Sequence, residues 1–239
     1  RIRLANRSNS RRRSSHFSSR AIHLMVSQCK TAILISGSGT NLQAFIDAVG
    51  NGNLDLDLTV VFSNNPNAYG LERAERAGIA TACIQHSDFL DRESFDCAVI
   101  TELDRHQPDL LILAGFMRIL SPAFVAHYSG KILNIHPALL PKYPGLNTHQ
   151  RVLDAGDKWH GSTVHFVTEE LDRGPRILQG RITVGPSETA DELRDRVQTI
   201  EHHIYPLAAS WVGSGKVVFK NGQCWVDGEK SSEPSQVTL

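Results

Sequence analysis

The sequence predicts a single-domain, Rossmann-like α/β fold with a mostly parallel twisted sheet and helices on both of its faces. From residue 31, short apolar runs alternate with segments of helical length, a pattern that forms right-handed βαβ units. The run DLLILAG at 109–115 is apolar throughout, as expected of a parallel strand buried on both faces. No linker or internal repeat interrupts residues 31–228, which we therefore assign to one domain.

Each element is placed by its composition and by the residues at its ends. Runs rich in apolar and β-branched residues predict strands at 31–36, 58–63, 80–85, 109–115, 131–135, 162–167 and 176–184. The segments between them predict helices at 41–49, 68–78, 88–106, 121–128, 147–155 and 187–212. Gly78 ends the second helix, and Ser121 followed by Pro122 opens the fourth. A hairpin around KNGQ completes the series, and residues 229–239 are left as a tail.

Length and composition exclude several classes of protein. With 239 residues, of which 41% are hydrophobic, the chain can bury one substantial core. No apolar run approaches the roughly 18 residues that a membrane span needs, so we expect a soluble protein. The four cysteines form no CxxC pair, which argues against a thiolate zinc site and favours a reducing compartment.

Charge is distributed unevenly along the chain. Residues 1–30 contain eight of the 25 Lys and Arg and none of the 25 Asp and Glu, so 17 basic and 25 acidic residues remain. The rest of the chain therefore carries a net charge of −8, which makes nucleic acid a poor candidate partner.

The basic Ser/Arg-rich arm at 1–30 has three interpretations. It has the composition of a mitochondrial or plastid transit peptide, and it could also be a tail that binds an acidic partner. Alternatively, translation starts at Met25 and the arm is absent from the mature protein. We expect the arm to be disordered in each case, and the protein to be cytoplasmic unless the arm is a transit peptide.

The stretch KILNIHPALLPKYPGLN, residues 131–147, is typical of a functional site. Asn134 and His136 share one face of the expected strand, and Ile135 lies on the other. Pro137 favours an extended backbone at His136, so an amide and a titratable ring project together from a stiff strand end.

Three further segments are expected near the carboxyl ends of strands, where such sheets bind ligands. ISGSGTNLQ at 35–43 leads into a helix and suits a monophosphate, although a tight turn capped by Thr40 or Asn41 would look the same. AGFMRIL at 114–120 could line a pocket for a flat aromatic ligand, or form ordinary core. In HFVTEELDRGP at 165–175, Asp172 could be a surface turn residue or could face His136.

The eleven histidines do not predict a metal site. His202 and His203 are adjacent in a helix and cannot share a face, and no HxH or HxxxH cluster has a carboxylate nearby. Five others are expected to be solvated or capping residues: His86, His106, His127, His149 and His160. The absence of a GxSxG motif argues against a serine hydrolase.

Six segments occur in a characteristic order and at characteristic spacing: ISGSGTNLQ, FSNNPNAYGLERA, LAGFMRILSP, NIHPALLPKYPGL, HFVTEELDRGP and RVQTIEHHIYP. Over about residues 31–228 this set resembles the phosphoribosylglycinamide formyltransferase family, which has a formyltransferase fold of the predicted class. The NxHP…LLP segment alone is shared with related folate-dependent formyltransferases. The resemblance does not cover the basic arm.

The resemblance implies a reaction and its substrates. Members of the family transfer the formyl group of 10-formyltetrahydrofolate, a co-substrate, to the amine of 5-phosphoribosylglycinamide (GAR) in de novo purine biosynthesis. No metal, nucleic acid or membrane is implied as a partner, and both a monomer and a homodimer remain open.

The resemblance also implies site residues. The catalytic residues would be Asn134, His136 and Asp172. The residues that bind GAR would be Gly39, Thr40, Asn41, Leu42, Gln43, Gln198 and Glu201. The residues that bind folate would be Arg92, Met117, Arg118, Ile119, Leu120, Asn134, Thr168, Glu169, Glu170, Leu171 and Asp172. Arg173 stands where close bacterial relatives carry a small residue, which affects the folate mouth at most.

The chemistry explains why an amide, an imidazole and a carboxylate would be needed. Direct attack of the amine on the formyl carbon gives a tetrahedral oxyanion, to which Asn134 and a protonated His136 could donate hydrogen bonds. The imidazole could then move a proton from the attacking to the departing nitrogen. Asp172 would favour the imidazolium form and could order a water relay.

Three alternatives remain at this point. Methionyl-tRNA formyltransferase would use the same chemistry but should carry a basic C-terminal domain, whereas this sequence ends in an acidic context. Formyltetrahydrofolate hydrolase should carry an N-terminal regulatory domain, for which 30 residues are too few. A non-catalytic nucleotide-binding module that recruits RNA through its arm would show salt-sensitive RNA binding without turnover.

Overall fold

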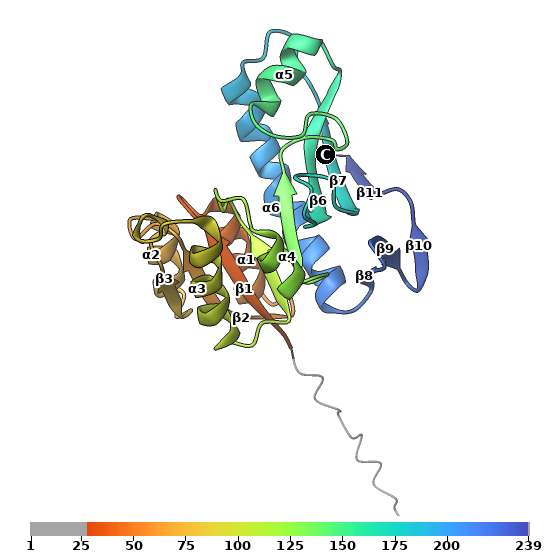
Figure 1. Ribbon diagram of the computed structural model, residues 1–239. Coiled ribbons are helices and arrows are strands. Elements are labelled where there is room, and N and C mark those ends of the chain that lie inside the picture. Colours follow the sequence, from red (N-terminus) through yellow and green to blue (C-terminus); the bar gives the residue numbers. More distant parts are fainter. Residues whose placement is uncertain (1–27, 239) are drawn as a thin grey trace, which may run out of the picture.

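Figure 1 shows the computed structural model, which describes residues 28–238. Its centre is an eight-stranded sheet in the order β11-β7-β6-β5-β4-β1-β2-β3. Strand β6 runs antiparallel to β5 and β7, and the other pairings in this sheet are parallel. The strands are β1 (Cys29–Ile35), β2 (Leu56–Ser63), β3 (Thr81–Cys83), β4 (Leu110–Leu113), β5 (Ile132–His136), β6 (Trp159–Phe166), β7 (Arg176–Thr183) and β11 (Ser235–Thr238). The predicted mostly parallel sheet is therefore confirmed.

The helices fall close to their predicted positions. They are α1 (Thr40–Gly50), α2 (Tyr69–Arg76), α3 (Arg92–Asp104), α4 (Pro122–His127), α5 (Thr148–Ala155) and α6 (Ala190–Gly213). Helix α3 begins four residues later than predicted, because the Asp91 side chain accepts a hydrogen bond from the Ser94 N–H and caps the helix there. A short 3₁₀ turn, His86–Asp88, precedes it.

The structure differs from the predicted boundaries at both ends of the domain. Strand β1 begins at Cys29, so residues 29–30, assigned above to the arm, belong to the sheet. Residues 229–238, assigned above to a tail, contain β10 (Glu229–Ser231) and β11, which extends the main sheet beside β7. Strand β10 pairs with β9 (Gln223–Val226), which forms the predicted hairpin with β8 (Val217–Lys220). Strands β10 and β11 were not predicted because their sequences are polar and only backbone pairing defines them. The prediction of disorder in the arm lies outside the described residues.

Two hydrophobic clusters cover the two faces of the sheet. Along β1, Ile33 and Ile35 contribute to one cluster, whereas Ala32 and Leu34 contribute to the other, as the twofold alternation of a strand requires. Helices α1 and α6 pack on the first face, and α3 and α4 on the second. Both faces are therefore buried, which explains the continuous apolar run of β4.

Helix α6 fixes the strands that carry the site. It starts with a capping box formed by Thr189 and Glu192, and it runs behind β5, β6 and β7 in Figure 1. The buried Tyr205 hydroxyl on this helix lies 3.0 Å from the carbonyl oxygens of both Leu113 and Leu133. These contacts tie the last residue of β4 and the second residue of β5 to α6. No helix in residues 28–238 is long and apolar enough to cross a membrane.

Candidate active site

Four segments meet around the end of β5, but they reach it in two ways. The segments after β1, β4 and β5 follow parallel strands and so emerge at the same edge of the sheet. The loop at 167–175 follows the antiparallel β6, so it must fold back to bring Asp172 beside β5. Asp172 has φ of 54°, a left-handed conformation that Asp tolerates better than most residues. Of the two roles considered for Asp172, the structure shows the one facing His136.

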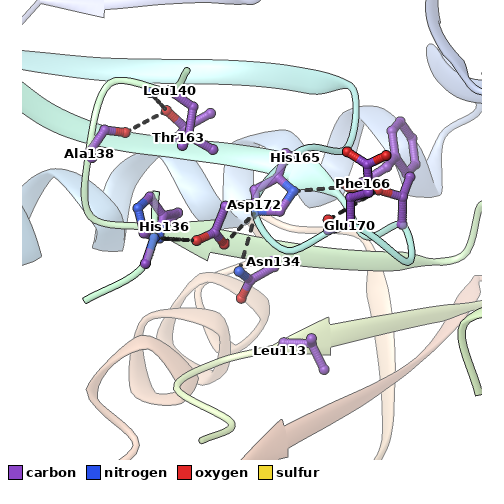
Figure 2. A network of polar contacts seen from close by, with 12 residues as sticks. Leu113, Asn134, His136, Ala138, Leu140, Thr163, His165, Phe166, Glu170 and Asp172 are labelled. Atoms are coloured by element: carbon purple, nitrogen blue, oxygen red, sulfur yellow. Dashed lines mark hydrogen bonds and ion pairs between the residues drawn. The ribbon is translucent and has the colours of Figure 1, made fainter. Parts of the chain in front are cut away.

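The imidazole of His136 and the carboxylate of Asp172 form a buried pair (Figure 2). His136 Nδ1 lies 3.4 Å from Asp172 Oδ2, and both side chains are almost fully buried. His136 Nε2 donates to the carbonyl oxygen of Tyr143 at 2.8 Å. The same Asp172 Oδ2 accepts from the Gly145 N–H at 2.9 Å. The loop after β5 thus holds both members of the pair.

His165 orients the Asn134 amide, and sequence analysis missed this role. Because His165 Nδ1 donates to the Phe166 carbonyl at 2.9 Å, its Nε2 carries a lone pair and accepts from Asn134 Nδ2 at 3.3 Å. Burial lowers the pKa of His165, which agrees with this neutral tautomer. His165 Nε2 also lies 4.0 Å from Asp172 Oδ1 (Figure 2). Asn134 and His165 meet because they are paired residues of the neighbouring strands β5 and β6. No spacing in the sequence reveals this pairing.

Strands β6 and β7 hold the proline-rich loop in place. The Thr163 hydroxyl donates to the Ala138 carbonyl at 2.6 Å and accepts from the Leu140 N–H at 3.1 Å, as Figure 2 shows. Gln179 Nε2 donates to the Leu140 carbonyl at 2.8 Å. The peptide between Leu140 and Pro141 is cis. The wall behind His136 is therefore fixed by hydrogen bonds as well as by proline.

A cavity of about 430 Å³, here called the α1–α6 pocket, contains many of the residues expected to bind GAR. Gly39 is the N-cap of α1 with φ of 70°, and α1 has no side-chain cap. A Cβ at Gly39 would lie 2.8 Å from the Cα of Gly70, so glycine is required there. The first N–H groups of α1 are therefore available to an anion. The lining includes Gly39, Thr40, Asn41, Gln198, Glu201, His149 and Arg194.

Polar side chains of α1 and α6 are locked together across this pocket. Gln198 Nε2 donates to Thr40 Oγ1 at 2.9 Å, and Asn41 Nδ2 donates to Glu201 Oε2 at 2.9 Å. Thr40 and Asn41 consequently do not cap the helix, contrary to the tight-turn interpretation.

Two residues expected to bind GAR do not line the α1–α6 pocket. The Leu42 side chain is buried in the core. Gln43 is bonded to Asp47 and Arg73. Either residue could reach a ligand in this pocket only through its backbone.

A smaller cavity of about 120 Å³, here called the loop pocket, contains most of the residues expected to bind folate. It is lined by Leu113, Phe116, Arg118, Ile119, Leu120, Val125, Asn134, His165, Val167 and residues 168–172. Ile119 and Leu171 at its mouth are 62% and 59% exposed. The Arg118 guanidinium lies 5.9 Å from the centre of the Phe95 ring.

Two of the residues expected to bind folate lie elsewhere. Met117 lines the α1–α6 pocket instead. Arg92 lies at the start of α3 and pairs with Glu93 at 3.3 Å, outside the lining of the loop pocket.

A larger cavity adjoins the loop pocket and shares Thr168, Glu169 and Glu170 with its lining. It encloses about 890 Å³, with Arg173 and Lys230 also in its lining. None of Asn134, His136 and Asp172 lines it. Chemistry rather than size therefore identifies the site.

The prediction that His149 and His160 are solvated or capping residues is wrong. His149 Nδ1 and His160 Nε2 lie 2.9 Å apart, and His160 is buried. Burial, with smaller contributions from His149 and His136, lowers the pKa of His160 to about 4. His149 lines the α1–α6 pocket, so this neutral pair lies against it.

Comparisons with known proteins identify the family. The formyl transferase family model matches residues 29–209. Phosphoribosylglycinamide formyltransferase of Escherichia coli (strain K12) is 52% identical over 198 residues, which are 83% of this chain and 93% of that protein. The trifunctional purine biosynthetic protein adenosine-3 of Homo sapiens is 45% identical over 204 residues, which are 84% of this chain but 20% of that protein.

The fold of this chain also matches that of a solved structure from the same family. The phosphoribosylglycinamide formyltransferase from Coxiella burnetii, in complex with CHES, aligns with a TM-score of 0.84 at 45% identity. The alignment covers 88% of this chain and 99% of that one. Because family model, sequence and fold agree, the resemblance inferred from the six segments is confirmed. The chain belongs to the formyl transferase family and, within it, to the phosphoribosylglycinamide formyltransferases.

Proposed function

We propose that this enzyme transfers the formyl group of 10-formyltetrahydrofolate to the amine of GAR, a step of de novo purine biosynthesis. One observation carries the proposal: the α1–α6 pocket and the loop pocket share the end of β5. Ile135 and Pro137 line the first, whereas Asn134 lines the second. Two substrates held in these pockets would meet beside Asn134, His136 and Asp172, and this proximity would supply much of the rate.

The pockets suit different substrates. The uncapped start of α1 favours the phosphate of GAR, because its N–H groups and helix dipole attract anions. The loop pocket offers the apolar side chains of Phe116, Ile119 and Leu171 to a flat pterin ring. The backbone and amide groups around Asn134 would fix the orientation of that ring.

In the proposed reaction the GAR amine attacks the formyl carbon directly. A C–N bond forms, and the former carbonyl oxygen becomes an oxyanion. Asn134 Nδ2 uses one N–H on His165, so its second N–H is the donor for the oxyanion. Removing such a donor typically costs about 2.7–4 kcal/mol of transition-state stabilisation. No covalent enzyme intermediate is needed.

His136 and Asp172 would complete the proton transfer. As the intermediate collapses, the bond between the formyl carbon and folate N10 breaks, and a proton passes from the attacking nitrogen to N10. His136 Nδ1 faces Asp172, whereas Nε2 is bonded to the Tyr143 carbonyl. Contact between Nε2 and the intermediate therefore requires that hydrogen bond to open. Asp172 would keep the ring in position while this happens.

The test is a direct assay of the purified full chain. With GAR and 10-formyltetrahydrofolate together, we expect stoichiometric release of tetrahydrofolate and formation of formyl-GAR, measured by absorbance and mass spectrometry. Folate release without GAR would instead identify a hydrolase, and formylation of methionyl-tRNA would identify the tRNA enzyme. Oligomeric state, a cytoplasmic location and the absence of a resident metal remain predictions.

A further inference from the structure

The hydroxyl of Ser162 lies between two oxygen atoms that cannot both accept its single proton. Ser162 is on β6 and is fully buried. Its Oγ lies 2.7 Å from the carbonyl oxygen of His136 and 2.9 Å from Glu201 Oε1. A backbone carbonyl has no proton to give, so the contact with His136 requires the hydroxyl to donate to it.

The contact between Ser162 and Glu201 must then take its proton from the carboxyl group. Two oxygens with lone pairs alone would repel each other at 2.9 Å, whereas a protonated Glu201 Oε1 donates to Ser162 Oγ. The other carboxyl oxygen, Oε2, accepts from Asn41 Nδ2 at 2.9 Å. Counting donors and acceptors in this way leaves each of these contacts with one proton.

The surroundings of Glu201 favour the same state. Burial raises the pKa of Glu201, and hydrogen bonding opposes that rise only in part. Other titratable or charged groups nearby are His149 on α5, Arg194 on α6 and the Tyr205 phenol one turn along α6. His136 lies on β5, where its carbonyl receives the Ser162 hydroxyl. Among the described residues, none of these forms an ion pair with Glu201.

We propose that Glu201 works as a neutral carboxylic acid and that, through Ser162, it positions the backbone of His136. The resulting chain runs from Asn41 on α1 to Glu201 on α6, then to Ser162 on β6 and His136 on β5. It connects the α1–α6 pocket to the catalytic strand through three hydrogen bonds. Ser162 is thus a positioning residue, which acts on the reaction only through His136.

Neutrality of Glu201 has a chemical consequence that rests on the proposed function. GAR must attack as a free amine, and an ionised carboxylate in its pocket would stabilise the unreactive ammonium form. A neutral acid can still hydrogen-bond to GAR without favouring that charge. The pocket would therefore select the reactive form of its substrate.

The test measures the protonation state itself and needs no substrate. In protein labelled with ¹³C at glutamate carboxyl carbons, Glu201→Gln identifies the Glu201 resonance by its disappearance. We expect this resonance to show the neutral acid at pH 7, whereas the exposed Glu192, identified with Glu192→Gln, should be ionised. A carboxylate signal from Glu201 at pH 7 would overturn the proposal. Failure of the formyl-transfer assay would refute the proposed function without changing this result.

Ser162→Ala distinguishes the two directions of the hydrogen bond. If Glu201 donates to Ser162, removing the acceptor destabilises the acid and lowers its titration midpoint by about one pH unit, the worth of one hydrogen bond. If Ser162 donates to a carboxylate instead, the midpoint rises, which would contradict the proposal. Ser162→Thr keeps the hydroxyl, so its titration midpoint and its kcat should both stay close to the wild-type values. KM for GAR should change little.

Discussion

The two pockets beside β5 differ in how firmly their walls are held. In the α1–α6 pocket, Thr40 and Asn41 are bonded to Gln198 and Glu201, and all four lie on helices. In the loop pocket the mouth is made by Ile119 and Leu171, which lie on loops and are more than half exposed. Polar groups lose hydrogen bonds when they are misplaced, so their pocket must be preorganised, whereas apolar side chains can adjust to a ligand.

The largest expected effect lies where the pockets meet. His136→Ala or Asp172→Asn should lower kcat by roughly 10²–10⁴-fold, because each removes part of the proton transfer that both substrates need. Steady-state kinetics with each substrate varied in turn measures the loss. Because His136 lines neither pocket and Asp172→Asn keeps the size of a side chain that lines only the loop pocket, the two KM values should change little.

A matched control comes from another histidine–aspartate pair. His127, at the end of α4, lies 3.0 Å from Asp104 and is more exposed than His136. His127→Ala should leave kcat within about twofold, as expected of a surface pair. Near wild-type turnover in both His136→Ala and Asp172→Asn would refute the assigned catalytic roles.

Low pH should lower the free energy of unfolding through His160, whose partner His149 lines the α1–α6 pocket. Its pKa is about 4 in the folded protein and close to 6.5 when unfolded, so below pH 6.5 the unfolded chain binds the proton first. The contribution of His160 to the free energy of unfolding is therefore fully present above pH 6.5. It is lost as the pH drops toward 4, and the loss is about 2 kcal/mol at pH 5. Urea unfolding at pH 7.5 and pH 5 measures this loss. In His160→Asn the difference between the two pH values should shrink by that amount; an equal difference in both proteins would contradict the assignment.

Much of the fold could be predicted because it depends on local patterns. Apolar runs, helix caps and the strand–helix alternation placed every strand and helix of the central region within a few residues. Strands β10 and β11 could not be predicted, since Glu229–Ser231 and Ser235–Thr238 have no apolar pattern and exist through pairing with distant strands. Nor does a sequence show that β6 runs antiparallel.

The site was predictable only in part for a similar reason. Asn134 and His136 share a strand face, so alternation alone brings them together. His165, Ser162 and the pair of His149 with His160 depend on which strands and helices become neighbours. Leu42 was assigned to GAR through its position in a motif, but the helical period turns its side chain into the core.

A preorganised wall should be sensitive to the loss of one hydrogen bond. Thr40→Ala leaves Gln198 Nε2 without its partner at the uncapped start of α1. We expect KM for GAR to rise about tenfold, with kcat and KM for the folate nearly unchanged, because one such bond is worth about 1.4 kcal/mol. Thr101→Ala on α3 is the matched control, because within residues 28–238 the Thr101 hydroxyl bonds only to the Cys97 carbonyl. An unchanged KM for GAR would place the phosphate elsewhere.

Substitutions at the exposed mouth of the loop pocket should have the smallest effect on the kinetic constants. Leu171 is 59% exposed, so a pterin ring could cover only part of its side chain, and truncation to Ala loses that fraction of its burial. We expect Leu171→Ala to raise KM for 10-formyltetrahydrofolate about threefold and to leave KM for GAR unchanged. Leu146→Ala provides the control, because Leu146 is 82% exposed and lines neither pocket. A loss at Leu171 as large as that at Thr40 would mean that the mouth is as rigid as the α1–α6 pocket, because only a fixed wall fails to close over a missing side chain.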